Sequence, residues 1–99
     1  MTLPELQEFI QKMYGWKDEQ RGAEGTFLWL CEEVGELAAA LRESDQDALE
    51  LEFADVLAWL ATLANVKGVD LSRAIERKYG KGCPGCGKLI CACGESVKP

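Results

Sequence analysis

The sequence predicts an all-α protein, a four-helix bundle completed by oligomerisation and followed by a short cysteine-rich tail. Two observations favour helices. Apolar residues recur three and four positions apart over most of the chain, and no stretch alternates with strand period for long enough to form a sheet. A third observation separates the tail, where four cysteines fall within eleven residues. We therefore expect a helical domain over residues 1–80 and a cysteine-rich tail over residues 81–99.

The first helix is expected from its capping residues. Thr2 and Glu5 have the spacing of a capping box, and Pro4 is tolerated in the first turn of a helix. Apolar residues then recur at helical spacing as far as about Met13, and these positions are expected to form core. They are Leu6, Phe9, Ile10 and Met13.

The pattern breaks between residues 14 and 25, where three glycines and a cluster of charges predict a loop. This stretch mixes aromatic and cationic side chains, as a nucleotide pocket does. Trp16, Lys17 and Arg21 are therefore candidate substrate-binding residues, with the two cations suited to phosphate.

Three further helices are expected, over residues 26–42, 47–67 and 71–79. The residues that cap or end them are Ser44, Asp45, Gly68, Asp70 and Gly80. In its second half the helix at 47–67 is apolar nearly all the way round, so it is expected to be buried on more than one side. A chain of this length does not supply that much cover, and we expect a homodimer or homotetramer.

Two acidic motifs lie on the second and third expected helices. Residues 32–36 read Glu-Glu-Val-Gly-Glu, and residues 52–55 read Glu-Phe-Ala-Asp. Residues three apart share one face of a helix, so Glu33 pairs with Glu36, and Glu52 pairs with Asp55. The polar stretch between the motifs is long enough for a helix hairpin, whose antiparallel packing would bring the two pairs opposite each other.

The four paired carboxylates are candidate metal ligands. They lie among apolar residues with no lysine or arginine inside either motif, and burying a carboxylate without a partner is costly. Hard oxygen ligands suit Mg²⁺, with Mn²⁺ as the alternative ion. The opposing interpretation is that each pair belongs to a solvated helix face, in which case the protein is a non-enzymatic helical oligomerisation module.

The charge balance excludes several functions. The chain has 11 basic and 17 acidic residues, a net charge of −6 and no histidine. This balance argues against nucleic-acid binding, but not against a nucleotide substrate, because bound divalent ions reverse the local sign of the charge. Without histidine there is no Ser-His-Asp triad and no histidine-ligated zinc hydrolase. No run is apolar enough to span a membrane and no export signal is evident, so we expect a soluble cytoplasmic protein.

The tail has the spacing of a zinc site. Cys83 and Cys86 form a Cys-x-x-Cys turn, and Cys91 and Cys93 form a second close pair. Such turns let both sulfurs of a pair face one tetrahedral ion, and four thiolates would close its coordination shell, so the expected role is structural. Disulfides are the alternative. The fifth cysteine, Cys31, is expected to be a small buried residue of the second helix.

The acidic motifs and their flanks resemble the MazG-like nucleoside triphosphate pyrophosphohydrolases of the all-α nucleotide pyrophosphatase superfamily. The signature of this family is a Glu-Glu-x-x-Glu segment, a variable linker and a Glu-x-x-Asp segment, which match residues 32–36 and 52–55. The flanks at residues 26–30 and 64–71 are similar to those of small single-domain members. The resemblance covers roughly residues 6–79, and the cysteine tail is not part of the family pattern.

The resemblance implies Mg²⁺-dependent hydrolysis of a nucleoside triphosphate between the α and β phosphates, in nucleotide-pool house-cleaning. By position, Glu33, Glu36, Glu52 and Asp55 would hold the metal, and Glu32 would orient or activate water. A phosphoribosyl-ATP pyrophosphohydrolase of the same superfamily is the alternative.

The resemblance also implies where the substrate is held. Lys78 and Lys81 can take the place of a family lysine near the phosphates, and a Lys-Asp-x-x-Arg-Gly stretch like that of small members contains Lys17 and Arg21. Base stacking would fall to an aromatic residue, for which the candidates are Trp16, Trp29 and Trp59.

Overall fold

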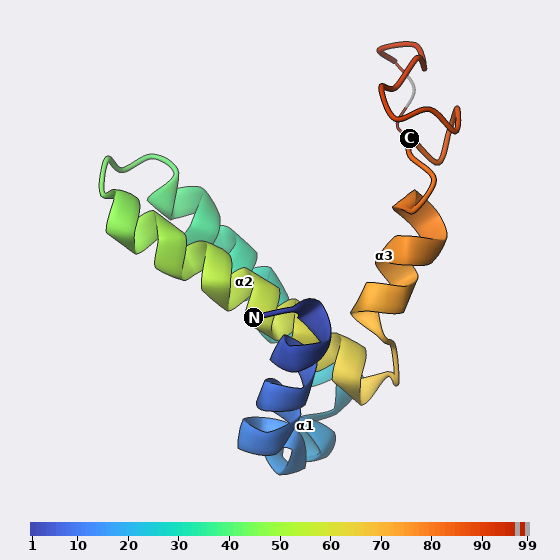
Figure 1. Cartoon of the computed structure of the whole chain (residues 1–99). Helices are drawn as coiled ribbons and strands as arrows, with labels where there is room; N and C mark the ends of the chain where they lie inside the picture. Colours follow the sequence, from blue (N-terminus) through green and yellow to red (C-terminus); the bar gives the residue numbers. More distant parts are fainter. Residues whose placement is uncertain (97, 99) are drawn as a thin grey trace. The chain divides into compact units, whose positions relative to one another are not determined.

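The computed structural model describes residues 1–96 and 98, and over these residues the regular structure is entirely helical. Three helices follow one another along the chain: α1 (Leu3–Ala40), α2 (Gln46–Val66) and α3 (Leu71–Tyr79) (Figure 1). Two compact units divide the chain, one over Met1–Val69 and the other beginning at Asp70. The all-α prediction is confirmed, whereas the domain boundary expected at residue 80 stays a prediction.

Helix α1 begins with the capping box that the sequence predicts. The backbone N–H of Glu5 donates to Thr2 Oγ1 at 3.2 Å, and the backbone N–H of Thr2 donates to Glu5 Oε1 at 2.9 Å. These two bonds satisfy N–H groups that have no partner inside the helix. They also lower the pKa of Glu5, because a carboxylate that accepts hydrogen bonds is favoured in its charged form.

The loop predicted over residues 14–25 is wrong. The helix continues through this stretch, and the non-helical backbone within α1 is confined to Gly22, with φ 76° and ψ 177°. Residues that carry a side chain rarely adopt this backbone conformation, so glycine is favoured at position 22. Gly15 and Gly25 keep helical geometry. Four helical segments therefore exist, as expected, but the first two meet at a single residue.

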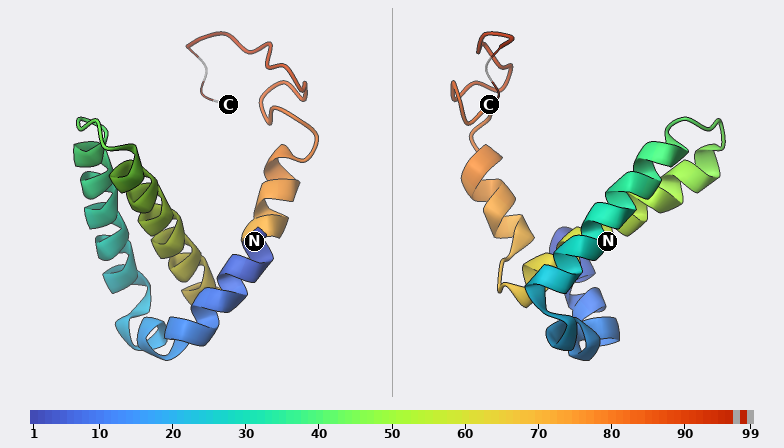
Figure 2. Two further views of the ribbon diagram at one scale, coloured as in Figure 1. Left: turned by 60° about the vertical axis from the view of Figure 1, so that its left-hand side comes forward. Right: turned by 180° about the vertical axis from the view of Figure 1, so that it is seen from behind.

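The segment of α1 after Gly22 lies beside α2, and the chain reverses direction in the short connection between them (Figures 1 and 2). Asp45 caps α2 by accepting from the backbone N–H groups of Asp47 and Ala48 at 3.1 and 3.2 Å. This is the helix hairpin that the sequence predicts. Asp70 caps α3 in the same way, accepting from the backbone N–H of Arg73 at 3.1 Å.

A polar contact fixes the first segment of α1 against the end of α2. The Gln7 side chain donates from Nε2 to Asn65 Oδ1 at 3.0 Å and to the Val69 carbonyl at 2.8 Å. Asn65 returns a bond from Nδ2 to the Gln7 carbonyl at 3.0 Å. Gln7 is buried, so this pairing satisfies polar groups that would otherwise be costly to bury.

The single chain has a small apolar core, made of Ile10, Ala40, Ala61 and Ala64. Ile10 was expected there and is buried, but Phe9 and Met13, which were also expected there, are about half exposed. In the apolar half of α2, Leu57 and Leu60 are 43% and 42% exposed. Both segments of α1 contact α2, yet these two leucines keep a large exposed fraction.

The prediction that Cys31 is buried is wrong, since this residue is exposed. Trp29 faces α2, and a residue two positions along a helix lies about 200° further round. Cys31 therefore points away from the packed side of α1. Among the described residues, no helix combines the length and apolar character that crossing a membrane requires.

Candidate metal and nucleotide site

Three carboxylates from two helices come together where α1 and α2 pack. Glu33 and Glu36 are one turn apart on α1, and Glu52 lies opposite on α2. One oxygen from each of these residues lies within 4.8 Å of the others. The antiparallel hairpin thus brings together motifs that are about twenty positions apart in the sequence.

The cluster has no compensating cation among the described side chains. Glu33 Oε2 and Glu52 Oε2 are buried and have no hydrogen-bond partner there. Burial, together with the neighbouring Glu36, Asp55 and Glu52 carboxylates, raises the pKa of Glu33 to about 7. Burial, with Glu36 and Asp55 beside it, also raises the pKa of Glu52. Carboxylates that repel one another in this way fit a hard divalent cation, which would satisfy the buried oxygens and offset the repulsion.

The other two acidic residues of the motifs lie at the margin of this cluster. Asp55 is exposed, but it is near enough to Glu33 and Glu52 to raise the pKa of each. Glu32 is exposed on α1. Asp55 also lines a neighbouring cavity, so it connects the acidic cluster to a space that a substrate can enter.

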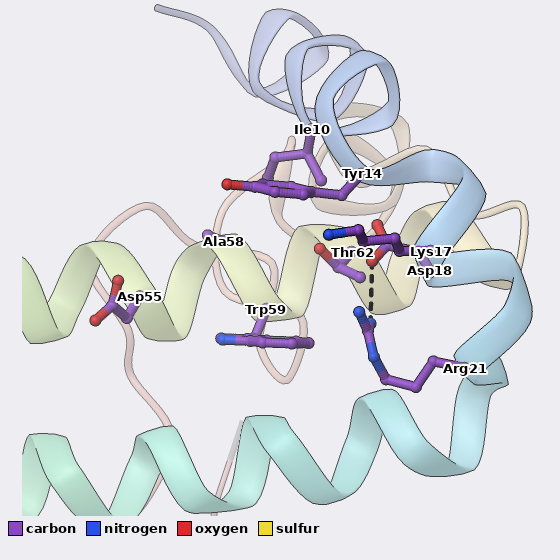
Figure 3. A pocket seen from close by; sticks show the side chains of 9 residues that line it. All are labelled: Ile10, Tyr14, Lys17, Asp18, Arg21, Asp55, Ala58, Trp59 and Thr62. Carbon is purple, nitrogen blue, oxygen red and sulfur yellow. Dashed lines mark hydrogen bonds and ion pairs between the residues drawn. The ribbon is translucent and has the colours of Figure 1, made fainter.

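This cavity has a volume of about 410 Å³, within the range of small-molecule pockets. The first segment of α1 supplies one wall and α2 supplies the other (Figure 3). The lining residues are Ile10, Tyr14, Lys17, Asp18, Arg21, Asp55, Ala58, Trp59 and Thr62. In Figure 3 the rings of Tyr14 and Trp59 are seen edge-on, one on each side of the cavity.

Arg21 links the residues around the kink in α1. Its Nη1 donates to Asp18 Oδ1 at 3.0 Å and to Thr26 Oγ1 at 3.3 Å, so it contacts residues on both sides of Gly22. The Arg21 guanidinium also lies over the Trp59 ring, 4.9 Å from its centroid. This cation-π contact joins the kink to α2.

The structure brings some of the expected substrate-binding residues together. Lys17, Arg21 and Trp59 line the cavity. Trp29 stacks on Trp59 with ring centroids 6.1 Å apart and is not among the lining residues. Trp16 is 72% exposed and does not line the cavity either, so its binding role stays a prediction.

Sequence reasoning missed Tyr14, Asp18 and Thr62 as lining residues. Tyr14, Lys17, Asp18 and Arg21 are spaced at i, i+3, i+4 and i+7, which is the signature of one helix face. Interpreting this stretch as a loop hid that pattern. Recognising the periodicity across the glycines would have placed Asp18 beside the two predicted cations.

The tail cysteines form a second cluster, within the unit that begins at Asp70. All four are free thiols whose sulfurs lie within 4.8 Å of one another. Cys83 Sγ is 3.6 Å from Cys91 Sγ and 3.8 Å from Cys93 Sγ. Tetrahedral thiolates at a typical zinc distance would be about 3.8 Å apart, so this arrangement fits such an ion.

Backbone N–H groups and neighbouring thiols shape the acidity of the cluster. The N–H groups of Ala92 and Lys88 lower the pKa of Cys86 to about 6, because they donate to its sulfur. The neighbouring thiols of Cys91 and Cys83 raise the pKa of Cys93 to about 12. One thiol is therefore ready to ionise at neutral pH, as a metal ligand must.

Lys78 and Lys81 also belong to this second unit. Both line a surface pocket beside the Cys83 turn, and Lys78 Nζ lies 5.7 Å from the centroid of the Tyr79 ring. Their expected contact with substrate phosphates stays a prediction.

Comparison with known proteins agrees with these features. The profile of the MazG nucleotide pyrophosphohydrolase domain matches residues 21–85. A dATP/dGTP diphosphohydrolase from Cyanophage S-2L is 40% identical over 77 residues, which cover 78% of this chain and 70% of that protein. The chain therefore belongs to the MazG family and is a nucleotide pyrophosphohydrolase.

Proposed function

We propose that this protein hydrolyses a deoxynucleoside triphosphate between its α and β phosphates, with Mg²⁺ held by Glu33, Glu36, Glu52 and Asp55. The products are the nucleoside monophosphate and pyrophosphate. The observation that carries the proposal is the convergence of three carboxylates, two of which have a buried oxygen with no hydrogen-bond partner in the described part of the chain. Enzymes of this family generally use a divalent metal, and magnesium accepts carboxylate oxygens together with phosphates.

The chain's own residues have distinct roles in this proposal. The four carboxylates bind the metal between the two helices, and Glu32 orients or activates the attacking water. Lys17 and Arg21 line the adjoining cavity, and their positive charges steer the anionic substrate toward the site. When bound, Mg²⁺ neutralises phosphate charge and lowers the pKa of the attacking water.

The similar protein from Cyanophage S-2L is named for dATP and dGTP, which supports a purine deoxynucleotide as the first substrate to test. Removing such a triphosphate, or a damaged one, from the nucleotide pool is the role that we propose in the cell. Phosphoribosyl-ATP serves as the comparison substrate, because it distinguishes the two activities of the superfamily.

We also propose that Zn²⁺ occupies the four tail cysteines in a structural role. Four thiolates complete a tetrahedral shell and leave no position for substrate. The sulfur separations and the free thiols support this ion over disulfides.

A homodimer or homotetramer is the assembly that we propose. Large apolar side chains are exposed on both packed helices, among them Phe27, Leu28, Leu51, Phe53 and Leu57. Many large exposed apolar side chains on a small chain favour burial against another copy. Sedimentation of the purified protein tests this, and a monomer at micromolar concentration would contradict it.

The function is tested by pyrophosphate release from the four common deoxynucleoside triphosphates, with Mg²⁺ and with EDTA. We expect release that requires metal and is lost in Glu36→Gln and Asp55→Asn. Glu50→Gln is the matched control, because it neutralises an exposed carboxylate on α2 outside the cluster. Equal release with and without metal would reject the proposal.

A further inference from the structure

Asp18 is a buried acid that lines the cavity, and only one of its two carboxylate oxygens accepts a hydrogen bond among the described residues. The residue is 3% exposed, and its Oδ1 accepts from Arg21 at 3.0 Å. Its Oδ2 is buried and has no hydrogen-bond partner among the described residues. A buried acceptor without a donor is destabilising, so a donor from a bound ligand would stabilise this position.

Asp18 lines one end of the cavity, and Asp55, which borders the acidic cluster, lines the other end. Asp55, Ala58, Trp59 and Thr62 follow one face of α2, and Asp18 lies at the Thr62 end (Figure 3). The seven positions from Asp55 to Thr62 correspond to about 10 Å along the helix axis. The base and the phosphates of a nucleotide lie at opposite ends of the sugar. Phosphates directed toward Asp55 therefore bring the base toward Asp18.

The walls between these ends suit a flat aromatic ring. Tyr14 and Trp59 present ring faces on opposite sides of the space (Figure 3). Trp29 stacks on Trp59 and holds the indole in place, and the Arg21 guanidinium also lies over the Trp59 ring. Trp59 and Arg21 therefore form the wall opposite Tyr14 together, and a guanidinium plane stacks on a base as an aromatic ring does. A preorganised aromatic wall stacks any base and does not distinguish between bases, so selection falls to the polar group at the end.

We propose that Asp18 selects the base, by accepting hydrogen bonds from N–H groups on its Watson–Crick edge, and that guanine is the favoured base. Guanine offers two adjacent donors, N1–H and the 2-amino group, and a carboxylate is an acceptor only. Adenine offers its 6-amino group alone on that edge. The inference rests on the proposed function, because it names the base of the same substrate.

Equilibrium binding to the unmodified protein provides the first test. The probes are dGTP and dITP analogues in which CH₂ replaces the bridging oxygen between the α and β phosphates, each measured with Mg²⁺ by calorimetry. The two differ only in the 2-amino group. Losing a hydrogen bond to a charged acceptor predicts at least about tenfold weaker binding of the dITP analogue. Equal affinities would overturn the proposal.

Substitution of Asp18 provides the second test. Asp18→Asn keeps the shape and an oxygen for Arg21, but it replaces the free acceptor with an N–H donor. We expect KM for dGTP to rise at least about tenfold, with a smaller effect on dITP and little change in kcat. Glu19→Gln is the control, an exposed acid at the neighbouring position. A loss of the same factor for every nucleotide, with an unchanged melting temperature, would show that Asp18 only supports the fold.

The two tests separate this proposal from the proposed function. If dGTP releases no pyrophosphate but the dGTP analogue binds more tightly than the dITP analogue, the hydrolytic function is rejected and the Asp18 site stands. If pyrophosphate is released equally well from dGTP and dITP, the Asp18 proposal is rejected and the hydrolytic function stands. Should Asp18→Asn fail to fold, the comparison of analogues on the unmodified protein decides.

Discussion

Two clusters of candidate metal ligands lie among the described residues, and they are built in opposite ways. The acidic cluster joins residues from two helices and depends on how those helices pack, whereas the cysteine cluster joins residues from one stretch of eleven. The acidic cluster presents hard oxygens beside an open cavity, and the cysteine cluster presents soft sulfurs that surround one point. The acidic site therefore requires the packed helices, whereas the cysteine site is a local structure that a bound metal can itself organise.

The largest expected effect is on catalysis and concerns the acidic cluster. Glu36→Gln removes one exposed ligand without opening a cavity, so we expect activity to fall by about 100-fold or more while the fold is retained. Pyrophosphate release and circular dichroism measure the two quantities. Full activity in this variant would contradict a catalytic role for the acidic cluster.

The double variant Cys83→Ser and Cys86→Ser tests the local character of the tail. We expect bound zinc to fall from one equivalent to none. Hydrogen exchange should become fast over residues 82–93, while α1 and α2 keep their protection. Metal analysis and exchange mass spectrometry measure these changes. Loss of protection throughout α1 and α2 would show that the tail supports the whole fold.

Substitutions at two glycines of α1 test whether the acidic cluster depends on how the helices pack. A Cβ at Gly22 or at Gly35 would meet nothing within 4 Å, but only Gly22 has a positive φ. Gly22→Ala should therefore destabilise the protein by about 1–3 kcal/mol and weaken Mg²⁺ binding, with zinc content unchanged. Gly35→Ala should stabilise it by about 0.5–1 kcal/mol. Urea unfolding measures both, and equal shifts would argue against a kink at Gly22.

A smaller effect is expected from pH on the metal-free protein. Burial and the neighbouring acids raise the pKa of Glu33 from 4.5 to about 7, so the folded state binds this proton more tightly than the unfolded state. Stability should therefore be highest below pH 4.5, as far as this group is concerned, and should fall as pH rises through about 7. Melting temperatures in EDTA measure the trend, which Glu33→Gln should flatten. If the melting temperature rises between pH 4.5 and about 7 in the unmodified protein but not in Glu33→Gln, the predicted direction is wrong.

The parts of the structure that were predicted from the sequence depend on local rules. Thr2, Asp45 and Asp70 cap helices as their residue types indicate, and the spacing within each acidic motif fixes the face on which its carboxylates lie. Because the two motifs lie on the two helices of a hairpin, antiparallel packing brings Glu33, Glu36 and Glu52 together.

The remaining features depend on tertiary context. Three glycines in twelve residues indicate a loop, but two of them tolerate helix and only Gly22 breaks it. Helical spacing alone does not show which apolar residues are buried by neighbouring elements. Phe9, Met13 and Cys31 were therefore expected to be buried, but they are exposed. The sequence also does not show that Asp18 lines a cavity, or that its Oδ2 is buried with no hydrogen-bond partner among the residues that the structure describes.

The most direct test of the central claim is a titration with Mn²⁺, followed by the electron paramagnetic resonance signal of the free ion. The unmodified protein should remove Mn²⁺ from solution at neutral pH. Glu52→Gln, which changes the half-buried ligand on α2, should bind it far more weakly. Equal binding by the two proteins would contradict a metal site made by α1 and α2 together.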